Sequence, residues 1–282
     1  MTSTNRSDTR PFRISPATGV HLRGEEAGQG AAVVLLHGLT ATRRYVVHGS
    51  SLLARRGHRV IAYDARGHGE SSPAPESTAY EYADLVSDLR HVIDDLGLQR
   101  PVLVGSSMGA TTAMALALDE PDRVSALVQI TPAFDGSPRK ERSDLERWDS
   151  LADALAREDI DAFLERSQIN AVPERIRETA LLAVRQRLER HRDLRAVSDA
   201  VRTVSRSQAF AGLEGLEALD LPVLVVGSRD DTDPGHPLAV AEEYAERLPR
   251  ARLLVEEPGE SPQAWRGSSL SKAIAGFLRS QL

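Results

Sequence analysis

Residues 102–114 read VLVGSSMGATTAM, an apolar strand that runs through a Gly-x-Ser-x-Gly motif into a helix. Ser107 stands at the centre of the motif, with Gly105 and Gly109 two residues to either side. A tight strand-to-helix turn lifts the serine hydroxyl clear of the sheet, and the glycines leave room for that turn. The turn also directs the first N–H groups of the helix toward an anion. The motif therefore predicts that Ser107 is a nucleophile beside a site for negative charge.

Outward from this motif, apolar strands alternate with helices along most of the chain. One or two edge strands are expected within residues 11–26. Further strands are expected at 31–36, 59–63, 102–105, 126–130, 221–226 and 252–255, and helices at about 43–56, 82–96, 108–119, 238–248 and 268–278. Such alternation predicts an α/β fold with a doubly wound, mostly parallel sheet.

The alternation stops once, between residues 138 and 215, where the pattern is helical and rich in arginine and glutamate. We therefore expect a core made of two parts, residues 11–137 and 216–282, which a helical insertion at 138–215 separates. Residues 1–10 are polar and are expected to be disordered.

Composition excludes several classes of function. The 282 residues include no cysteine, which excludes disulfides and thiolate metal sites. The net charge is −6 with both signs interspersed, so nucleic acid is not an expected partner. No apolar run approaches the ~18 residues of a membrane span, and the polar N-terminus lacks a secretory signal, so a cytoplasmic protein is expected. No nucleotide, flavin or metal motif is present, so we expect no cofactor or metal and a small-molecule substrate.

Distinctive motifs follow four of the expected strands, at the edge where open parallel sheets bind ligands. They are HGLT at 37–40, DARGHGES at 64–71, the serine motif, and the acidic residues from Asp230 onward. This set resembles the α/β-hydrolase fold family over residues 31–279. The resemblance implies that the insertion at 138–215 is a cap over the serine.

The same resemblance implies roles for individual residues. Ser107 would be the nucleophile, and the backbone N–H groups of Leu39 and Met108 would form the oxyanion hole. Asp230 falls where the family places its triad acid, with Asp231 and Asp233 as poorer alternatives. His37 and His68 stand where the family commonly carries structural histidines, although His37 remains a further candidate for the site.

The sequence departs from the family at the catalytic histidine. The turn after the last strand reads EPGESP at 257–262, with Glu260 where the family has histidine, and no histidine occurs after residue 236. A serine needs a general base to take its proton. Three interpretations stay open: His236 is the base, Glu260 takes that role, or hydrolysis has been lost. His48 is a weaker candidate for the base.

The leading hypothesis is a serine hydrolase that acts on a small carboxylic ester, thioester or lactone through a Ser107 acyl-enzyme. Epoxide hydrolases and dehalogenases of the family carry a carboxylate where Ser107 stands, which disfavours those activities. The alternative is a ligand-binding protein, or a lyase or isomerase that uses the oxyanion hole, because Glu260 replaces the usual histidine.

Overall fold

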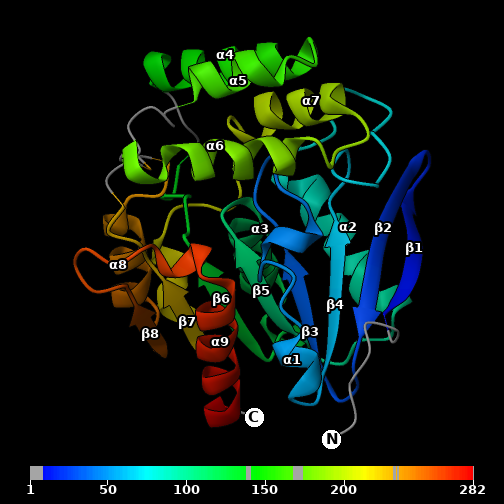
Figure 1. Cartoon of the computed structure of the whole chain (residues 1–282). Coiled ribbons are helices and arrows are strands. Elements are labelled where there is room, and N and C mark those ends of the chain that lie inside the picture. Colours follow the sequence, from blue (N-terminus) through cyan, green and yellow to red (C-terminus); the bar gives the residue numbers. More distant parts are fainter. Residues whose placement is uncertain (1–8, 138–140, 168–173, 231–232, 234, 282) are drawn as a thin grey trace, which may run out of the picture.

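The computed structural model describes residues 9–137, 141–167, 174–230, 233 and 235–281, and within these it contains one eight-stranded sheet in the order β1-β2-β4-β3-β5-β6-β7-β8 (Figure 1). Strands β3 to β8 pair in parallel, while β2 pairs antiparallel with both β1 and β4. The strands are β1 (Arg10–Ala17), β2 (Val20–Ala27), β3 (Ala31–Leu36), β4 (His58–Asp64), β5 (Val102–Ser106), β6 (Ala126–Ile130), β7 (Val223–Val226) and β8 (Ala251–Leu254). The predicted α/β fold with a mostly parallel sheet is confirmed.

Helices cover both faces of the sheet, which explains why its central strands are apolar throughout. One face packs on α2 (Tyr82–Asp95), α3 (Met108–Asp119) and α8 (Leu238–Arg247). The other packs on α1 (Leu52–Arg55) and α9 (Gly267–Gln281). Strand β5 lies between β3 and β6 in the middle of the sheet, so the turn that follows it is held by packing on both sides.

The chain between β6 and β7 forms helices that gather at one end of the sheet, above the strands in Figure 1. They are α4 (Arg142–Ala156), α5 (Ile160–Arg166), α6 (Glu174–Leu188) and α7 (Leu194–Val204), followed by the 3-10 turn η5 (Glu214–Ala218). Leu151, Leu155, Phe163 and Val197 contribute to a separate apolar cluster that joins these helices to one another. We refer to α4–α7 as the cap helices.

Two local expectations need correction. Residue 10 is not disordered, because Arg10 begins β1; residues 1–8 lie outside the described part of the chain. The helix expected at 43–56 is instead the 3-10 turn η2 (Arg43–Tyr45) and the single turn α1, separated by His48 and Gly49 with φ of 49° and 71°. A helix requires negative φ, so these two residues interrupt it.

Two further 3-10 turns, η3 (Pro121–Arg123) and η6 (Gln263–Trp265), precede β6 and α9. Among the residues described, none of the helices combines the length and the apolar character that crossing a membrane requires.

Candidate functional site

The turn between β5 and α3 places Ser107 in a strained backbone conformation. Its φ of 50° and ψ of −112° lie outside the regions that residues with side chains prefer. A Cβ on Gly105 would overlap the backbone of Gly109, and one on Gly109 would overlap the carbonyl of Leu36. Both glycines are therefore required by close backbone approach, and the serine is presented at the carboxyl edge of the sheet.

His236 contacts the Ser107 hydroxyl across 129 residues of sequence. Its Nε2 lies 2.7 Å from Ser107 Oγ, and its Nδ1 lies 2.8 Å from Asp233 Oδ2. The network assigns the proton to Nδ1, which donates to the carboxylate, so that Nε2 accepts from the serine hydroxyl. The three side chains form a continuous hydrogen-bonded chain from carboxylate to hydroxyl.

Asp233 is kept ionised by its surroundings. Desolvation raises the pKa of its carboxyl, but the hydrogen bond and charge of His236, the N–H of Gly235 and the charge of Arg187 outweigh it. The pKa of Asp233 therefore lies below its ordinary value. A carboxylate in this state holds the imidazole in one tautomer and stabilises its protonated form.

Asp230 is not the carboxylate that His236 contacts, which corrects the order of preference drawn from the sequence. The backbone N–H of Asp233 donates to the Asp230 carbonyl at 3.1 Å, and the N–H of His236 donates to the Asp233 carbonyl at 3.1 Å. These two successive turns bring position 233 onto the imidazole. Asp231 lies outside the described residues.

Glu256, which the sequence did not single out, anchors the loop that carries Asp233 and His236. It is buried at the end of β8, where its carboxylate accepts hydrogen bonds from the Ser228 hydroxyl and from the backbone N–H groups of Arg229 and Gln263. Burial raises the pKa of Glu256, but these donors lower it below the ordinary value. The contacts tie the loop after β7 to the loop after β8.

The other two candidates for the base lie elsewhere. Glu260 is half exposed and forms an ion pair with Arg266 at 3.0 Å. His48 is exposed, and its Nε2 lies 2.9 Å from the Ala264 carbonyl. In the described part of the chain, neither side chain hydrogen-bonds to Ser107.

The backbone N–H groups of Leu39 and Met108 lie in the segments that flank Ser107. Met108 begins α3, and Gly38 packs so closely that its Cβ position would lie 3.4 Å from Ser107 Cβ. Neither N–H donates a hydrogen bond to any residue that the structure describes. Both donors remain available for a substrate oxygen.

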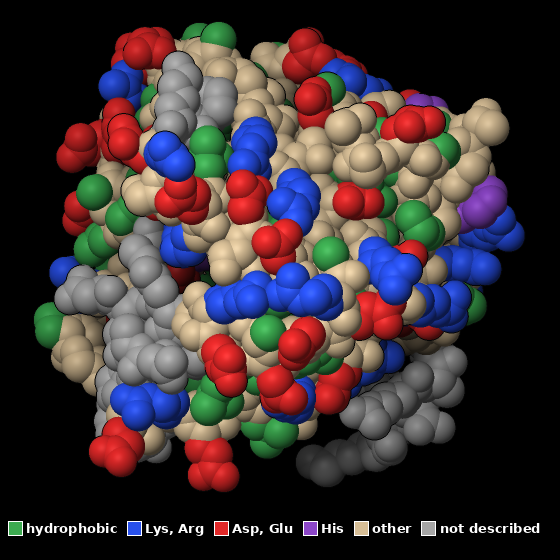
Figure 2. Space-filling model, turned by 90° about the horizontal axis from the view of Figure 1, so that it is seen from above, with side chains coloured by type: hydrophobic (Ala, Val, Ile, Leu, Met, Phe, Trp, Pro, Cys, Tyr) green, Lys and Arg blue, Asp and Glu red, His purple; other side chains and the backbone are tan. Residues whose placement is uncertain are grey.

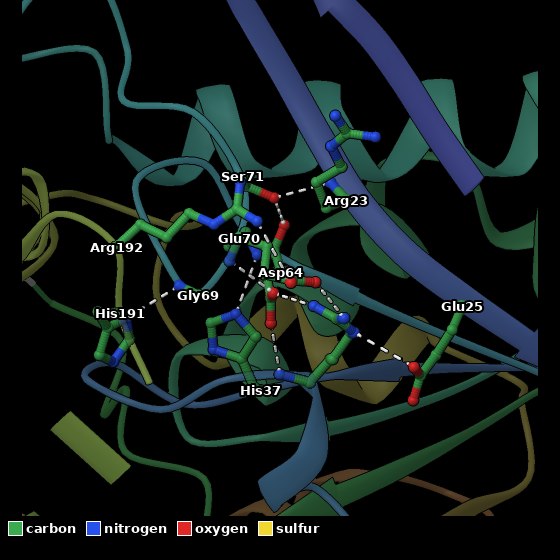
Figure 3. Close-up of polar contacts among 11 residues, drawn as sticks. Arg23, Glu25, His37, Asp64, Gly69, Glu70, Ser71, His191 and Arg192 are labelled. Carbon is green, nitrogen blue, oxygen red and sulfur yellow. Dashed lines mark hydrogen bonds and ion pairs between the residues drawn. The ribbon is translucent and has the colours of Figure 1, made fainter. Parts of the chain in front are cut away.

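A buried ion network holds the Leu39 loop in place. The Asp64 carboxylate, fully buried at the end of β4, accepts the backbone N–H groups of Arg43 at 2.8 Å and Glu70 at 3.0 Å, and pairs with the Arg43 guanidinium. Figure 3 shows Asp64 at the centre of these contacts, with His37 below it and His191 to the left. The charge pair fixes the chain that immediately follows the Leu39 segment.

Three buried histidines contact one another in a row, with tilted and edge-to-face ring geometry. Ring centroids of His37 and His68 lie 5.1 Å apart, and those of His68 and His191 lie 5.6 Å apart. His37 Nε2 accepts from the Ala65 N–H, whereas His191 Nδ1 accepts from the Gly69 N–H. Because both rings use a nitrogen lone pair, they are neutral in this arrangement. His37 therefore holds the Leu39 loop to the loop after β4, and its hydrogen bonds among the described residues go to Gly38 and Ala65, not to Ser107.

This row of histidines predicts acid lability. Burial lowers the pKa of His37 to about 4, of His68 to about 3 and of His191 to about 4. Unfolded histidine titrates near 6.5, so between about pH 6.5 and pH 4 the unfolded chain binds more protons than the folded one. The free energy of unfolding should therefore fall as the pH is lowered, by about 1.4 kcal/mol per pH unit for each histidine.

Urea unfolding at pH values between 6 and 4.5 measures this slope, which His68→Gln should reduce by about 1.4 kcal/mol per pH unit, the contribution of one histidine. Equal slopes in the wild type and His68→Gln would exclude the row of histidines as the cause.

The cap helices reach the site through Leu39 and Met108. Leu39 packs on the apolar cluster of the cap helices, and Met108 lies in a cluster with Val204 of α7. His191, between α6 and α7, donates through Nε2 to the Thr40 carbonyl at 3.1 Å. The sequence contained no local signal for this contact, because it joins residues 151 positions apart.

Among the residues that the structure describes, no group of three or more histidine, aspartate or glutamate side chains is arranged to hold a metal ion.

Comparison with protein families identifies a model described as alpha/beta hydrolase fold, which matches residues 31–265. A protein of Bacillus subtilis (strain 168), named as a 2-succinyl-6-hydroxy-2,4-cyclohexadiene-1-carboxylate synthase, is 28% identical over 277 residues, covering 95% of this chain and 98% of the relative. Epoxide hydrolase 2 of Siraitia grosvenorii is 35% identical over 116 residues, but that match spans only 41% of this chain and 37% of the relative.

Among solved structures, a thermophilic esterase from Thermogutta terrifontis superposes with a TM-score of 0.78. It is 24% identical, and the match covers 96% of this chain and 98% of the esterase. At this identity the likeness concerns the fold.

Proposed function

Because the chain belongs to the alpha/beta hydrolase fold family, we propose that it is a serine hydrolase that cleaves a small carboxylic ester, thioester or lactone. The observation that carries the proposal is the hydrogen-bonded chain from Asp233 through His236 to the Ser107 hydroxyl, with distances of 2.8 and 2.7 Å. A serine becomes a nucleophile when an oriented base lies within hydrogen-bond reach of it.

In the proposed reaction, Ser107 Oγ attacks the acyl carbon while His236 Nε2 takes the hydroxyl proton. The N–H groups of Leu39 and Met108 stabilise the oxyanion of the tetrahedral intermediate. His236 then donates its proton to the leaving alcohol, thiol or ring oxygen, which leaves an acyl-enzyme on Ser107. Water attacks this ester with His236 again as the base, and the carboxylic acid is released.

Asp233 is the proposed triad acid, and Glu256 is a positioning residue for the loop that carries it. The cap helices pack on Leu39 beside the serine, and we propose that they form the substrate pocket and exclude water. The 2.7 Å contact between His236 Nε2 and Ser107 Oγ supports His236 as the proposed base, in place of a histidine at position 260.

A second candidate is favoured by the similarity to the Bacillus subtilis synthase, which extends over nearly the whole of both chains. In that case the same groups would transfer protons and stabilise an oxyanion without an acyl-enzyme. The two candidates differ in one observable, the covalent acyl group on Ser107.

A fluorophosphonate probe tests the proposed function without knowledge of the natural substrate. The wild type should gain one adduct by intact-mass spectrometry, and Ser107→Ala should gain none. Ser106→Ala is the matched control, because the neighbouring serine ends β5 without contacting His236. Folded wild-type protein that gains no adduct would falsify the proposal. To separate hydrolysis from the second candidate, the reaction with p-nitrophenyl butyrate is quenched during turnover. A butyryl group found on Ser107 would indicate the acyl-enzyme of the hydrolase.

A further inference from the structure

Arg187, a residue of the cap helices, has no carboxylate partner among the residues that the structure describes. It lies in the last turn of α6, half-buried, and its Nε is shielded from solvent without a hydrogen-bond partner. Within the described residues, no carboxylate lies within ion-pair distance of its guanidinium, and no carbonyl accepts from it. An arginine remains charged even when burial lowers its pKa, as burial does here.

Several other arginines of the cap helices have carboxylate partners. Arg185 pairs with Asp161, Arg195 with Glu158, and Arg202 with Asp153. Figure 2, which views the molecule from above, shows basic and acidic side chains interspersed over this face. Acidic partners are therefore plentiful around the cap helices, and Arg187 differs from these three arginines in having no carboxylate partner within the described part of the chain.

The end of α6 that carries Arg187 lies beside the Leu39 loop, because His191, four residues further along the chain, donates to the Thr40 carbonyl at 3.1 Å. In agreement with this position, the charge of Arg187 contributes to lowering the pKa of both Asp233 and His191. One turn further, Arg190 donates to the Tyr45 hydroxyl at 3.3 Å. This end of α6 therefore adjoins both loops that flank Ser107.

Shielding a charged guanidinium from water without an anionic partner costs free energy. A bound anion offsets this desolvation penalty. Asp233 is not the anionic partner of Arg187, because it lies beyond ion-pair distance of Arg187 and its Oδ2 already binds His236. A guanidinium presents parallel N–H donors that match a carboxylate. We propose that Arg187 binds a carboxylate of the substrate, so that the preferred substrates are acyl compounds carrying a second, free carboxylate. This inference rests on the proposed function and names its substrate class.

Two esters of matched length test the inference. Mono-p-nitrophenyl glutarate carries a free carboxylate, and p-nitrophenyl pentanoate has a methyl group in its place. Wild-type kcat/KM should favour the glutarate. Arg187→Gln should lower kcat/KM for the glutarate about 10- to 100-fold and for the pentanoate less than about threefold. Arg187→Lys should keep part of the preference, because lysine retains the positive charge but lacks the parallel N–H donors of the guanidinium.

Arg185→Gln is the matched control, since Arg185 lies on the same helix and pairs with Asp161; it should leave the preference unchanged. If Arg187→Gln slows both esters equally, Arg187 acts through Asp233 and the inference is wrong. A wild type with no preference for the glutarate also overturns it.

A binding experiment separates this inference from the proposed function. Calorimetry should detect glutarate binding to Ser107→Ala and lose about 10- to 100-fold of the affinity in Ser107→Ala/Arg187→Gln. This result would support the inference even if neither ester were hydrolysed, in which case only the proposed reaction fails. Equal affinities, or no binding to Ser107→Ala, would contradict the inference.

Discussion

His236→Ala is expected to slow fluorophosphonate labelling and ester turnover by roughly 10⁴-fold. The imidazole is the only side chain that the structure places within hydrogen-bond distance of the Ser107 hydroxyl among the described residues. Without it, the serine must lose its proton to water while it attacks. The N–H groups of Leu39 and Met108 in the proposed oxyanion hole are unaffected by this substitution, so a residual rate above background should persist.

Glu260→Ala is the control that gives this result its meaning. Glu260 occupies the position after β8 where the family's histidine is expected, but it is half exposed and paired with Arg266. Its replacement should leave labelling within about twofold of wild type. A Glu260→Ala protein that loses labelling while His236→Ala retains it would reverse the assignment of the base. Circular dichroism of each variant confirms that the fold is intact.

Asp233→Asn is expected to lower kcat/KM by roughly 10³- to 10⁴-fold, whereas Asp230→Asn should change it only a few-fold. An amide at position 233 donates an N–H to Nδ1, which places the imidazole proton on Nε2. In that tautomer, Nε2 no longer accepts the proton of the Ser107 hydroxyl. The substitution therefore lowers activity because it places His236 in the wrong tautomer, and not because the hydrogen bond between positions 233 and 236 is lost.

The contacts of Asp230 with Ser228 and Asp233 are made by its backbone, which Asn preserves. Its N–H donates to the Ser228 hydroxyl at 3.1 Å, and its carbonyl accepts from the Asp233 N–H. Steady-state kinetics of both variants on p-nitrophenyl butyrate compare the two positions directly. A larger loss in Asp230→Asn than in Asp233→Asn would show that Asp230 is the acid.

Strand and helix positions in the core were predictable because each depends on the pattern of apolar residues within a short stretch of sequence. The apolar runs that became β3, β5 and β6 are too short for helices and end at polar residues. The segment at 43–56 was misread because a helical composition there is broken by positive φ at His48, a preference that the residue type does not announce. Backbone contacts made elsewhere determine such a conformation.

The candidate site was only partly predictable. Ser107 was identified because its strain and its glycines are local requirements of one turn. His236 was singled out because it follows a strand end on the same edge of the sheet. The choice between Asp230 and Asp233 depends on two backbone turns whose geometry spacing alone does not specify. Glu256 and Arg187 gave no signal, since single charged residues are common on solvent-exposed surfaces.

By itself, the sequence determined the α/β alternation, the interruption at 138–215 and the serine of the strand-to-helix turn, because hydrophobic periodicity and glycine spacing act over a few residues. Tertiary structure alone decided which carboxylate meets His236, how Glu256 holds that loop, and where the charge of Arg187 lies. These are contacts between segments distant in the chain, and hydrogen-bond distances and desolvation exist only once the strands, loops and cap helices are packed together.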